Sequence, residues 1–211
     1  MFGVVVPVKP PAVAKSRLAG LGDEVRLELC EAFALDTVNA VTECALVGAV
    51  LVVTDDVPLA RALADLGIPV IPDGVTDDLN ASLEQGAAEL SRRYPDLGVA
   101  AVFADLPSLR PAELELALRA ASPDGLSFVA DAGRAGTTTV IAPSVEVFRP
   151  RFGPGSRQAH LDAGAVEILD ELPGLRRDVD TPDDLAAAVA LGTGPRTSYV
   201  VTLHGLLGVG R

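Results

Sequence analysis

The sequence of 211 residues has no tryptophan and holds only two histidines, two cysteines and two lysines. His160 and His204 are too few and too far apart in the sequence to form a zinc site. Cys30 and Cys44 fall in one helical pattern, which favours ordinary packing in a reducing cytoplasm over a disulfide or a metal pair. No apolar run approaches the roughly 20 residues that a membrane span needs, and no basic segment precedes the first apolar stretch as in a signal peptide. We therefore expect a soluble, cytoplasmic protein.

Positive charge is also scarce, because 17 basic residues face 29 acidic ones and the net charge is −12. This balance argues against nucleic-acid binding, which needs a basic face, but a few local cations or a metal can still attract a small anion. Lys9 and Lys15 are the only lysines and lie in one loop with Arg17, after the first strand pattern. We predict that these three cations meet a triphosphate, and a solvated basic loop is the alternative.

Short apolar runs alternate with helical patterns along the chain, which is the order of elements in α/β proteins. The strands are expected at residues 3–8, 49–54, 68–71, 99–104, 127–130 and 138–142. The helices are expected at residues 24–44, 58–66, 79–94, 111–121, 156–163 and 181–191. We predict a single α/β domain over residues 1–195, with a mostly parallel, mixed sheet that carries helices on both faces.

The C-terminal tail, residues 196–211, follows a break rich in glycine, proline and threonine. It contains the apolar stretch Tyr199-Val-Val-Thr-Leu-His-Gly-Leu-Leu. Three interpretations stay open for it: a loose extension, an added edge strand, or a contact between copies in a homo-oligomer.

Ligands of open α/β sheets bind outside the carboxyl ends of the strands, so the residues that follow the strands are the first candidates. Asp105 follows the apolar run of residues 99–104, where a carboxylate has little water and needs a partner. A divalent cation is one such partner, and a role as a helix cap or turn residue is the alternative. The third predicted helix follows a polar loop, and we expect Asp77, Asp78 or Asn80 to cap it. Asn80 is alternatively expected to contact a nucleobase edge.

Asp178 and Asp180 stand two residues apart, so they share a face if their backbone is extended. Two carboxylates on one face repel each other unless a cation lies between them. The same segment suits a helix start, with Thr181 as the cap and Pro182 in the first turn. Together with Asp105, the pair predicts a metal site that is split between two loops.

This ordered set of motifs resembles the nucleotidyltransferases of the GT-A-like, or nucleotide-diphospho-sugar transferase, fold. The set comprises the cationic loop, Leu79-Asn80, Ala-Asp105-Leu-Pro-Ser-Leu and Asp178-Val-Asp180-Thr-Pro-Asp-Asp-Leu. Two further stretches, Gly136-Thr-Thr-Thr139 and Arg151-Phe-Gly153-Pro-Gly-Ser156, are similar to the guanylyltransferases of deazaflavin coenzyme F(420) biosynthesis. Members of that family activate phosphoenolpyruvate or 2-phospho-L-lactate with GTP. The resemblance covers roughly residues 1–195.

The resemblance implies that Asp105 and Asp178 hold Mg²⁺, with Asp180 close by. The nucleophile would be a phosphate oxygen of the acid, largely dianionic at neutral pH because the second pKa of a phosphate monoester is about 6. It would attack the α-phosphorus of GTP and expel pyrophosphate, so the reaction needs no histidine or cysteine. Mg²⁺ would bridge phosphoryl oxygens, and the cationic loop, above all Lys15, would offset charge on the leaving group. Asp105 and Lys15 are thus the implied catalytic residues.

The same resemblance implies that Thr139, Gly153 and Ser156 bind the phosphorylated carboxylic acid. Ser156 opens a predicted helix, where free N–H groups and the helix dipole favour an anion. A capped helix after a Gly-Pro turn is the alternative. Thr138 stands where the family pattern has a glycine, and we expect it to narrow the acid pocket.

The implied partners are GTP, the phosphorylated acid and the downstream transferase of the deazaflavin pathway, with no nucleic acid and no membrane. A cytidylyltransferase for a polyol phosphate or a guanylyltransferase for molybdopterin would be expected to have glycines in the first loop, which has none. A nucleotide-binding module without activity would not require the three aspartates. Phosphoenolpyruvate, 2-phospho-L-lactate and 3-phosphoglycerate stay open as the acid.

Overall fold

In residues 1–9, 15–75 and 78–206, which the computed structural model describes, seven strands form one sheet in the order β3-β2-β1-β4-β6-β5-β7. The strands are β1 (Phe2–Pro7), β2 (Val47–Val53), β3 (Val70–Ile71), β4 (Gly98–Val102), β5 (Ser127–Ala130), β6 (Thr137–Ala142) and β7 (Val166–Glu167). Only β6 runs antiparallel to its neighbours, β4 and β5, and the other pairs are parallel. The mostly parallel, mixed sheet expected from the sequence is confirmed.

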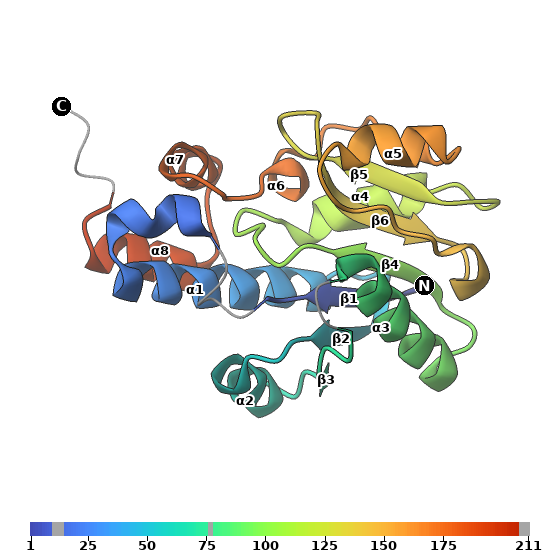
Figure 1. Cartoon of the computed structure of the whole chain (residues 1–211), viewed down its shortest axis with the longest axis horizontal. Coiled ribbons are helices and arrows are strands. Elements are labelled where there is room, and N and C mark those ends of the chain that lie inside the picture. Colours follow the sequence, from blue (N-terminus) through green and yellow to red (C-terminus); the bar gives the residue numbers. More distant parts are fainter. Residues whose placement is uncertain (10–14, 76–77, 207–211) are drawn as a thin grey trace.

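Helices cover both faces of this sheet (Figure 1). They are α1 (Asp23–Thr42), α2 (Val57–Asp65), α3 (Leu79–Arg93), α4 (Pro111–Ala120), α5 (Ser156–Asp162), α6 (Pro173–Arg176), α7 (Pro182–Leu191) and α8 (Pro195–Leu203), with short 3-10 helices η1 (Ser16–Leu21) and η2 (Val145–Val147). Each predicted helix and strand is present, with ends within about two residues of the prediction. None of the helices in the described residues is both long and apolar enough to cross a membrane.

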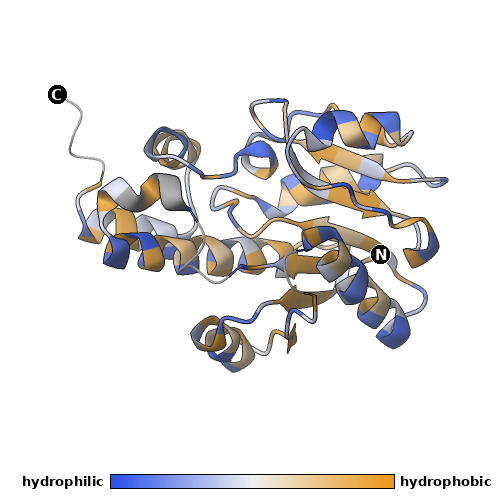
Figure 2. Ribbon diagram, in the orientation of Figure 1, coloured by the Kyte–Doolittle hydropathy of each residue, from blue (hydrophilic) through white to orange (hydrophobic). Residues whose placement is uncertain are grey.

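Side chains of each central strand alternate between two apolar cores, one on each face of the sheet. In β1, Val4 and Val6 pack beneath α1, α2 and α4, whereas Val5 packs beneath α3. Burial on both faces explains why β1 and β4 are continuous apolar runs in the sequence. Gly86 brings α3 close to β1, since a Cβ at this position would lie 2.7 Å from Val5 Cγ1. Figure 2 shows the apolar residues gathered in the sheet and the polar ones on the outer sides of the helices.

The described part of the C-terminal tail is a helix, α8, that packs against α1 (Figure 1). Val200 and Val201 are buried in a third apolar cluster with side chains of α1. Asp36 of α1 accepts hydrogen bonds from two N–H groups at the start of α8, including that of Thr197 at 2.8 Å. Residues 195–203 are thus neither an edge strand nor a loose extension. The homo-oligomer contact stays a prediction, and residues 207–211 lie outside the described part.

The strand order creates a crevice at one edge of the sheet. From β1 the chain passes through α1 to β2 on one side, and it returns through α3 on the opposite face to β4 on the other side. At such a switch point the connections leave the sheet in different directions, and ligands bind between them. Lys9 and Lys15 follow β1, and Asp105 follows β4, so the sheet brings these predicted residues to one place.

Candidate active site

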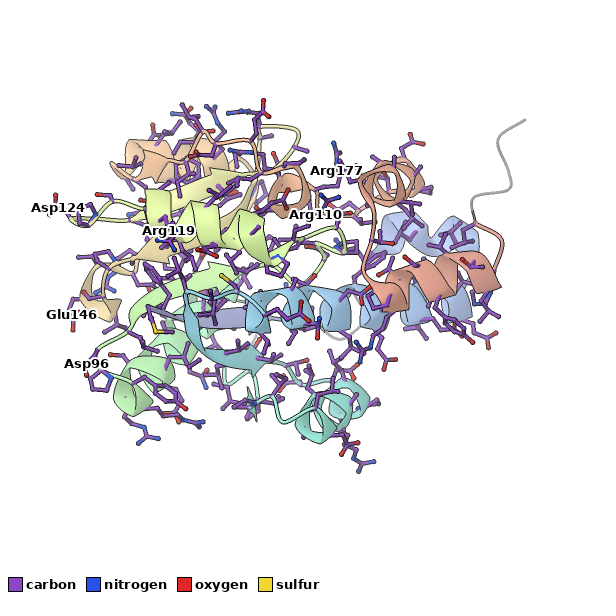
Figure 3. The ribbon with its side chains drawn as sticks, turned by 180° about the vertical axis from the view of Figure 1, so that it is seen from behind. Asp96, Arg110, Arg119, Asp124, Glu146 and Arg177 are labelled. Atoms are coloured by element: carbon purple, nitrogen blue, oxygen red, sulfur yellow. The ribbon has the colours of Figure 1, made fainter. Side chains whose placement is uncertain are left out.

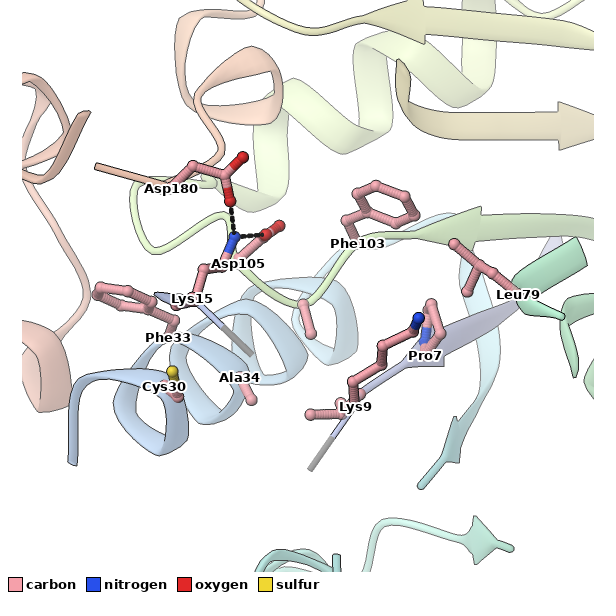
Figure 4. Close-up of a pocket in the computed structure, with 12 residues that line it drawn as sticks. Pro7, Lys9, Lys15, Cys30, Phe33, Ala34, Leu79, Phe103, Asp105 and Asp180 are labelled. Carbon is pink, nitrogen blue, oxygen red and sulfur yellow. Dashed lines mark hydrogen bonds and ion pairs between the residues drawn. The ribbon is translucent and has the colours of Figure 1, made fainter. Parts of the chain in front are cut away.

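A pocket lies at the carboxyl ends of β1 and β4 (Figure 4). It is lined by Pro7, Val8, Lys9, Lys15, Cys30, Phe33, Ala34, Leu79, Phe103, Ala104, Asp105 and Asp180. Apolar walls from α1 and the loop after β4 surround a few converging charges, which is the usual make-up of a site for a small molecule.

Lys15 is the centre of the charged side of this pocket. Its ammonium group forms ion pairs with the carboxylates of Asp105 and Asp180, and its side chain is only 12% exposed. Burial lowers the pKa of Lys15, but the two carboxylates outweigh that effect, so the pKa is raised and the ammonium stays charged. Lys15 also has a φ of 57°, a left-handed conformation that costs a non-glycine residue on the order of 1–3 kcal/mol. Such strain is concentrated at functional sites.

Negative charge still exceeds positive charge around this ammonium. Burial, reinforced by Asp105 and Asp180 and opposed by Lys15, raises the pKa of Asp178 to about 7. In addition, Oδ1 of Asp105 is buried and accepts no hydrogen bond from the described residues. Carboxylate oxygens in this condition are suitable ligands for a hard cation. No ready-made group of three metal-binding side chains occurs in the described part of the chain, so the metal site stays a prediction.

The sequence predicted that Asp105 directly follows a strand. In the structure β4 ends at Val102, so Asp105 lies within the loop after this strand. A buried residue of α1, Thr37, fixes this loop on both sides of Asp105. Its hydroxyl donates to the carbonyl oxygen of Ala104 at 3.0 Å and accepts from the N–H of Leu106 at 3.2 Å. Sequence reasoning missed Thr37, whose one signal is a polar residue on the apolar side of a helix.

The segment that carries Asp178 and Asp180 is bonded to the same loop. The N–H of Val179 donates to the carbonyl oxygen of Asp105 at 3.1 Å. Directly afterwards, Thr181 caps α7 by accepting from the N–H of Asp184 at 3.2 Å, which confirms the predicted helix start. The two carboxylates that hold Lys15 therefore come from two loops that support each other.

Further hydrogen bonds close the junction between the loop after β4 and α7. The hydroxyl of Ser108 and the guanidinium of Arg110 donate to carbonyl oxygens of α7 at 2.8 and 2.9 Å. The N–H of Gly194 donates to the carbonyl oxygen of Pro107 at 2.8 Å. Figure 3 labels Arg110 at this junction.

Two of the residues predicted to bind the acid, Gly153 and Ser156, lie in a second region at the start of α5, whereas Thr139 lies in β6. Thr139 of β6 is fully buried, and its hydroxyl has no hydrogen-bond partner among the described residues. Gly153 and Gly155 have φ values of 141° and 70°, which favour glycine, and they form the turn that leads to Ser156.

The structure does not place Thr139, Gly153 or Ser156 on the wall of the Lys15 pocket. An aromatic pair links the two regions, because Phe103 lines the pocket and stacks on Phe152 with ring centroids 4.6 Å apart. Gly153, which follows Phe152 in the chain, is thus linked to the pocket wall through this pair.

One of the two sequence predictions for Asn80, its role as helix cap, can be compared with the structure. The helix cap is Asp78, which accepts from the N–H of Ala81 at 3.0 Å, so the cap prediction for Asn80 is wrong. Its amide donates to the carbonyl oxygen of Phe152 at 3.0 Å and accepts from the N–H of the same residue at 2.8 Å. Both amide groups therefore bind the backbone of Phe152, and the nucleobase contact stays a prediction.

Three other predictions have separate outcomes. Thr138 donates its hydroxyl to the carbonyl oxygen of Leu175 on α6 at 2.7 Å, and its predicted effect on the acid pocket stays a prediction. Lys9 is exposed and lines the pocket. Arg17 belongs to η1, but its side chain lies outside the described part of the structure.

Residues 2–203 match the family described as "Guanylyl transferase CofC like". The chain belongs to this family. A family relative from Thermomonospora curvata, named "Phosphoenolpyruvate guanylyltransferase", is 51% identical over 93% of this chain and 87% of its own length. A relative of the same name from Streptomyces scabiei is 49% identical over 92% of this chain and 93% of its own length. The family assignment makes the chain a nucleotidyltransferase enzyme.

Two solved structures of nucleotidyltransferases have the same fold as this chain. A nucleotidyl transferase from Methanothermobacter matches with a TM-score of 0.66 and 21% identity, over 90% of this chain and 97% of the other. A cytidylyltransferase from Leptospira borgpetersenii matches with a TM-score of 0.59 and 12% identity, over 100% of this chain and 98% of the other. At these identities the comparison shows the fold alone, and it confirms the predicted nucleotidyltransferase architecture.

Proposed function

We propose that this enzyme transfers GMP from GTP to phosphoenolpyruvate, releasing pyrophosphate, as a step of coenzyme F(420) biosynthesis. The observation that carries the proposal is the high identity, over nearly the whole chain, to relatives named for phosphoenolpyruvate. The structure supports it with one pocket that joins a buried, charged lysine to aspartates from two loops. 2-Phospho-L-lactate is the second candidate acid, because it carries the same phosphate and carboxylate groups.

Mg²⁺ belongs to this proposal. Asp105 and Asp180 already converge on one cation, the ammonium of Lys15, and burial together with these two carboxylates raises the pKa of Asp178. The unpaired Oδ1 of Asp105 offers a further ligand atom. These three side chains would hold the ion, which would supply positive charge to offset the charge of the phosphates.

The cations after β1 would bind the polyphosphate of GTP. Lys15 keeps its proton because Asp105 and Asp180 stabilise the ammonium. Next to the phosphates, this charge would balance the negative charge that develops as pyrophosphate leaves. Lys9, exposed on the pocket wall, would meet the outer phosphates, and Arg17 is proposed beside them.

The acid would bind across the aromatic pair from this cluster. The buried hydroxyl of Thr139 has no described partner and can bond to a substrate oxygen. Gly153 can be approached closely, since a Cβ built there would have no atom within 4 Å and the space beside it is open. Ser156 completes the proposed acid site, and the acid's own phosphate oxygen acts as the nucleophile without a protein base.

The proposed surroundings of the reaction follow from the same chemistry. The free cysteines Cys30 and Cys44 support a reducing compartment, and we place the enzyme in the cytoplasm. The proposed product carries a phosphoanhydride bond between GMP and the phosphate of the acid. This bond activates the acid for transfer, so we propose that the downstream transferase of the deazaflavin pathway uses the product.

The test is to incubate the protein with GTP, Mg²⁺ and one acid at a time, in the presence of the downstream transferase. Phosphoenolpyruvate, 2-phospho-L-lactate and 3-phosphoglycerate are compared by mass spectrometry of the products and by pyrophosphate release. We expect the highest turnover with phosphoenolpyruvate. Absence of pyrophosphate with all three acids, from folded protein, would contradict the proposed function.

A further inference from the structure

His160 of α5 is a fully buried side chain that the proposed chemistry does not use. Its Nε2 atom accepts a hydrogen bond from the backbone N–H of Arg151 at 3.0 Å. Its Nδ1 atom lies 2.8 Å from the carbonyl oxygen of Ser156 and 3.1 Å from the hydroxyl of Thr137. Both ring nitrogens are thus used, and two of their partners are backbone groups of one short segment.

These contacts fix the protonation state of the ring. Because Nε2 accepts a hydrogen bond, the ring proton must be on Nδ1, where it is donated to the carbonyl oxygen of Ser156. Burial lowers the pKa of His160, which the Ser156 carbonyl opposes and Arg151 reinforces. The imidazole is therefore neutral at neutral pH, in one defined tautomer.

The backbone partners of His160 lie on either side of Gly153, in the segment of residues 151–156. Asn80 holds the same segment from α3, since its amide bonds to both backbone groups of Phe152. The ring of Phe152 also packs edge-on against the imidazole, with centroids 5.6 Å apart. Two side chains from different helices thus hold the backbone around Gly153 from two directions.

A segment fixed in this way is prepared for a ligand before the ligand arrives. If it moved, both ring nitrogens of His160 and both amide groups of Asn80 would lose their backbone partners, which is unfavourable. A site that is already ordered binds more tightly, because no ordering cost is added on binding. We propose that His160 and Asn80 are positioning residues that hold the 151–156 segment in shape for the acid substrate, and that they set the affinity for the acid but not for GTP.

This inference rests on the proposed function, because the acid is expected at Gly153 and Ser156. His160→Leu removes both ring hydrogen bonds, and Asn80→Ala removes both amide hydrogen bonds. We expect each variant to raise KM for phosphoenolpyruvate by about tenfold or more, while KM for GTP changes less than about twofold. His160→Gln retains one donor and one acceptor, and we expect it to recover most of the affinity for the acid.

The chain offers matched controls for both changes. His204→Leu removes the only other histidine, which follows α8 and pairs with Glu28 of α1 at 2.7 Å. Asn39→Ala removes the only other asparagine, which is exposed and pairs with Glu43 at 2.9 Å. We expect both controls to keep the wild-type KM for each substrate. Equal changes in the two KM values for His160→Leu, or no change for the acid, would overturn the proposal.

A second measurement keeps the inference separate from the proposed function. In a His204→Leu background, long-range nitrogen–proton NMR spectra should show one neutral imidazole with its proton on Nδ1. Amide exchange at Arg151 and Phe152 should become at least about tenfold faster in His160→Leu and Asn80→Ala, respectively. Inactive wild-type protein with these signals would contradict the proposed function alone, whereas the other tautomer or unchanged exchange would overturn the positioning role.

Discussion

Thr37→Val tests whether one buried hydroxyl supports the catalytic loop. The substitution preserves the shape of the side chain but removes the donor to Ala104 and the acceptor for the N–H of Leu106. Each buried group left without a partner costs about 1–3 kcal/mol. We therefore expect the free energy of unfolding to fall by about 2–4 kcal/mol, since two such groups are affected and the added methyl group recovers a little. Because these groups flank Asp105, we also expect turnover to fall.

Unfolding in urea can be followed by far-UV circular dichroism, a suitable method for a chain without tryptophan. Thr37→Ser keeps the hydroxyl and should retain turnover near the wild-type level. Thr42→Val is the matched control on the same helix, because it removes only a local hydrogen bond to Val38 at 2.8 Å. Two results would refute the reasoning. One is a Thr37→Val variant as stable as Thr42→Val, and the other is a Thr37→Val variant with full turnover at limiting Mg²⁺.

Three further predictions address the charges of the site and the C-terminal helix. Asp105→Asn should lower kcat by about 100-fold or more in a protein with an unchanged circular dichroism spectrum, and wild-type turnover would exclude its proposed metal role. Lys15→Ala should raise KM for GTP more than KM for the acid, and equal effects would argue against a triphosphate contact. Asp36→Ala should reduce the free energy of unfolding by about 1–2 kcal/mol, because it removes two hydrogen bonds at the start of α8. Asp96→Ala, at an exposed loop position, is the control and should change it by less than about 0.5 kcal/mol.

The fold could be predicted from the sequence because its signals are local. A strand buried on both faces, such as β4, is a continuous apolar run, and the helix at Thr181 begins with a cap and a proline. The elements that were missed have weak signals, since β7 has two residues and α6 has four. α8 was hidden by the break before Pro195, and its cap comes from Asp36, a residue on another helix.

The sequence predicted which residues lie in the candidate site better than it predicted the bonds between them. The switch point of the sheet explains why residues after β1 and β4 meet, and this follows from the order of elements. That Lys15 binds directly to both Asp105 and Asp180 could not be predicted, since these contacts depend on loops 90 and 165 residues away. For the same reason, the two hydrogen bonds from Asn80 to Phe152, 72 residues away, had no local signal.

The ion pair between Lys15 and Asp180 has a consequence for how the enzyme is made. Ribosomes add residues from the N-terminus at about 5–20 per second, so a chain synthesised in this order displays Lys15 long before Asp180 exists. The 165 residues that separate them correspond to an interval of roughly 10–30 seconds. During that interval the sheet from β1 to β6 can form, but the charged cluster cannot. Catalytic competence therefore arrives last, after nearly all of the polypeptide has been synthesised.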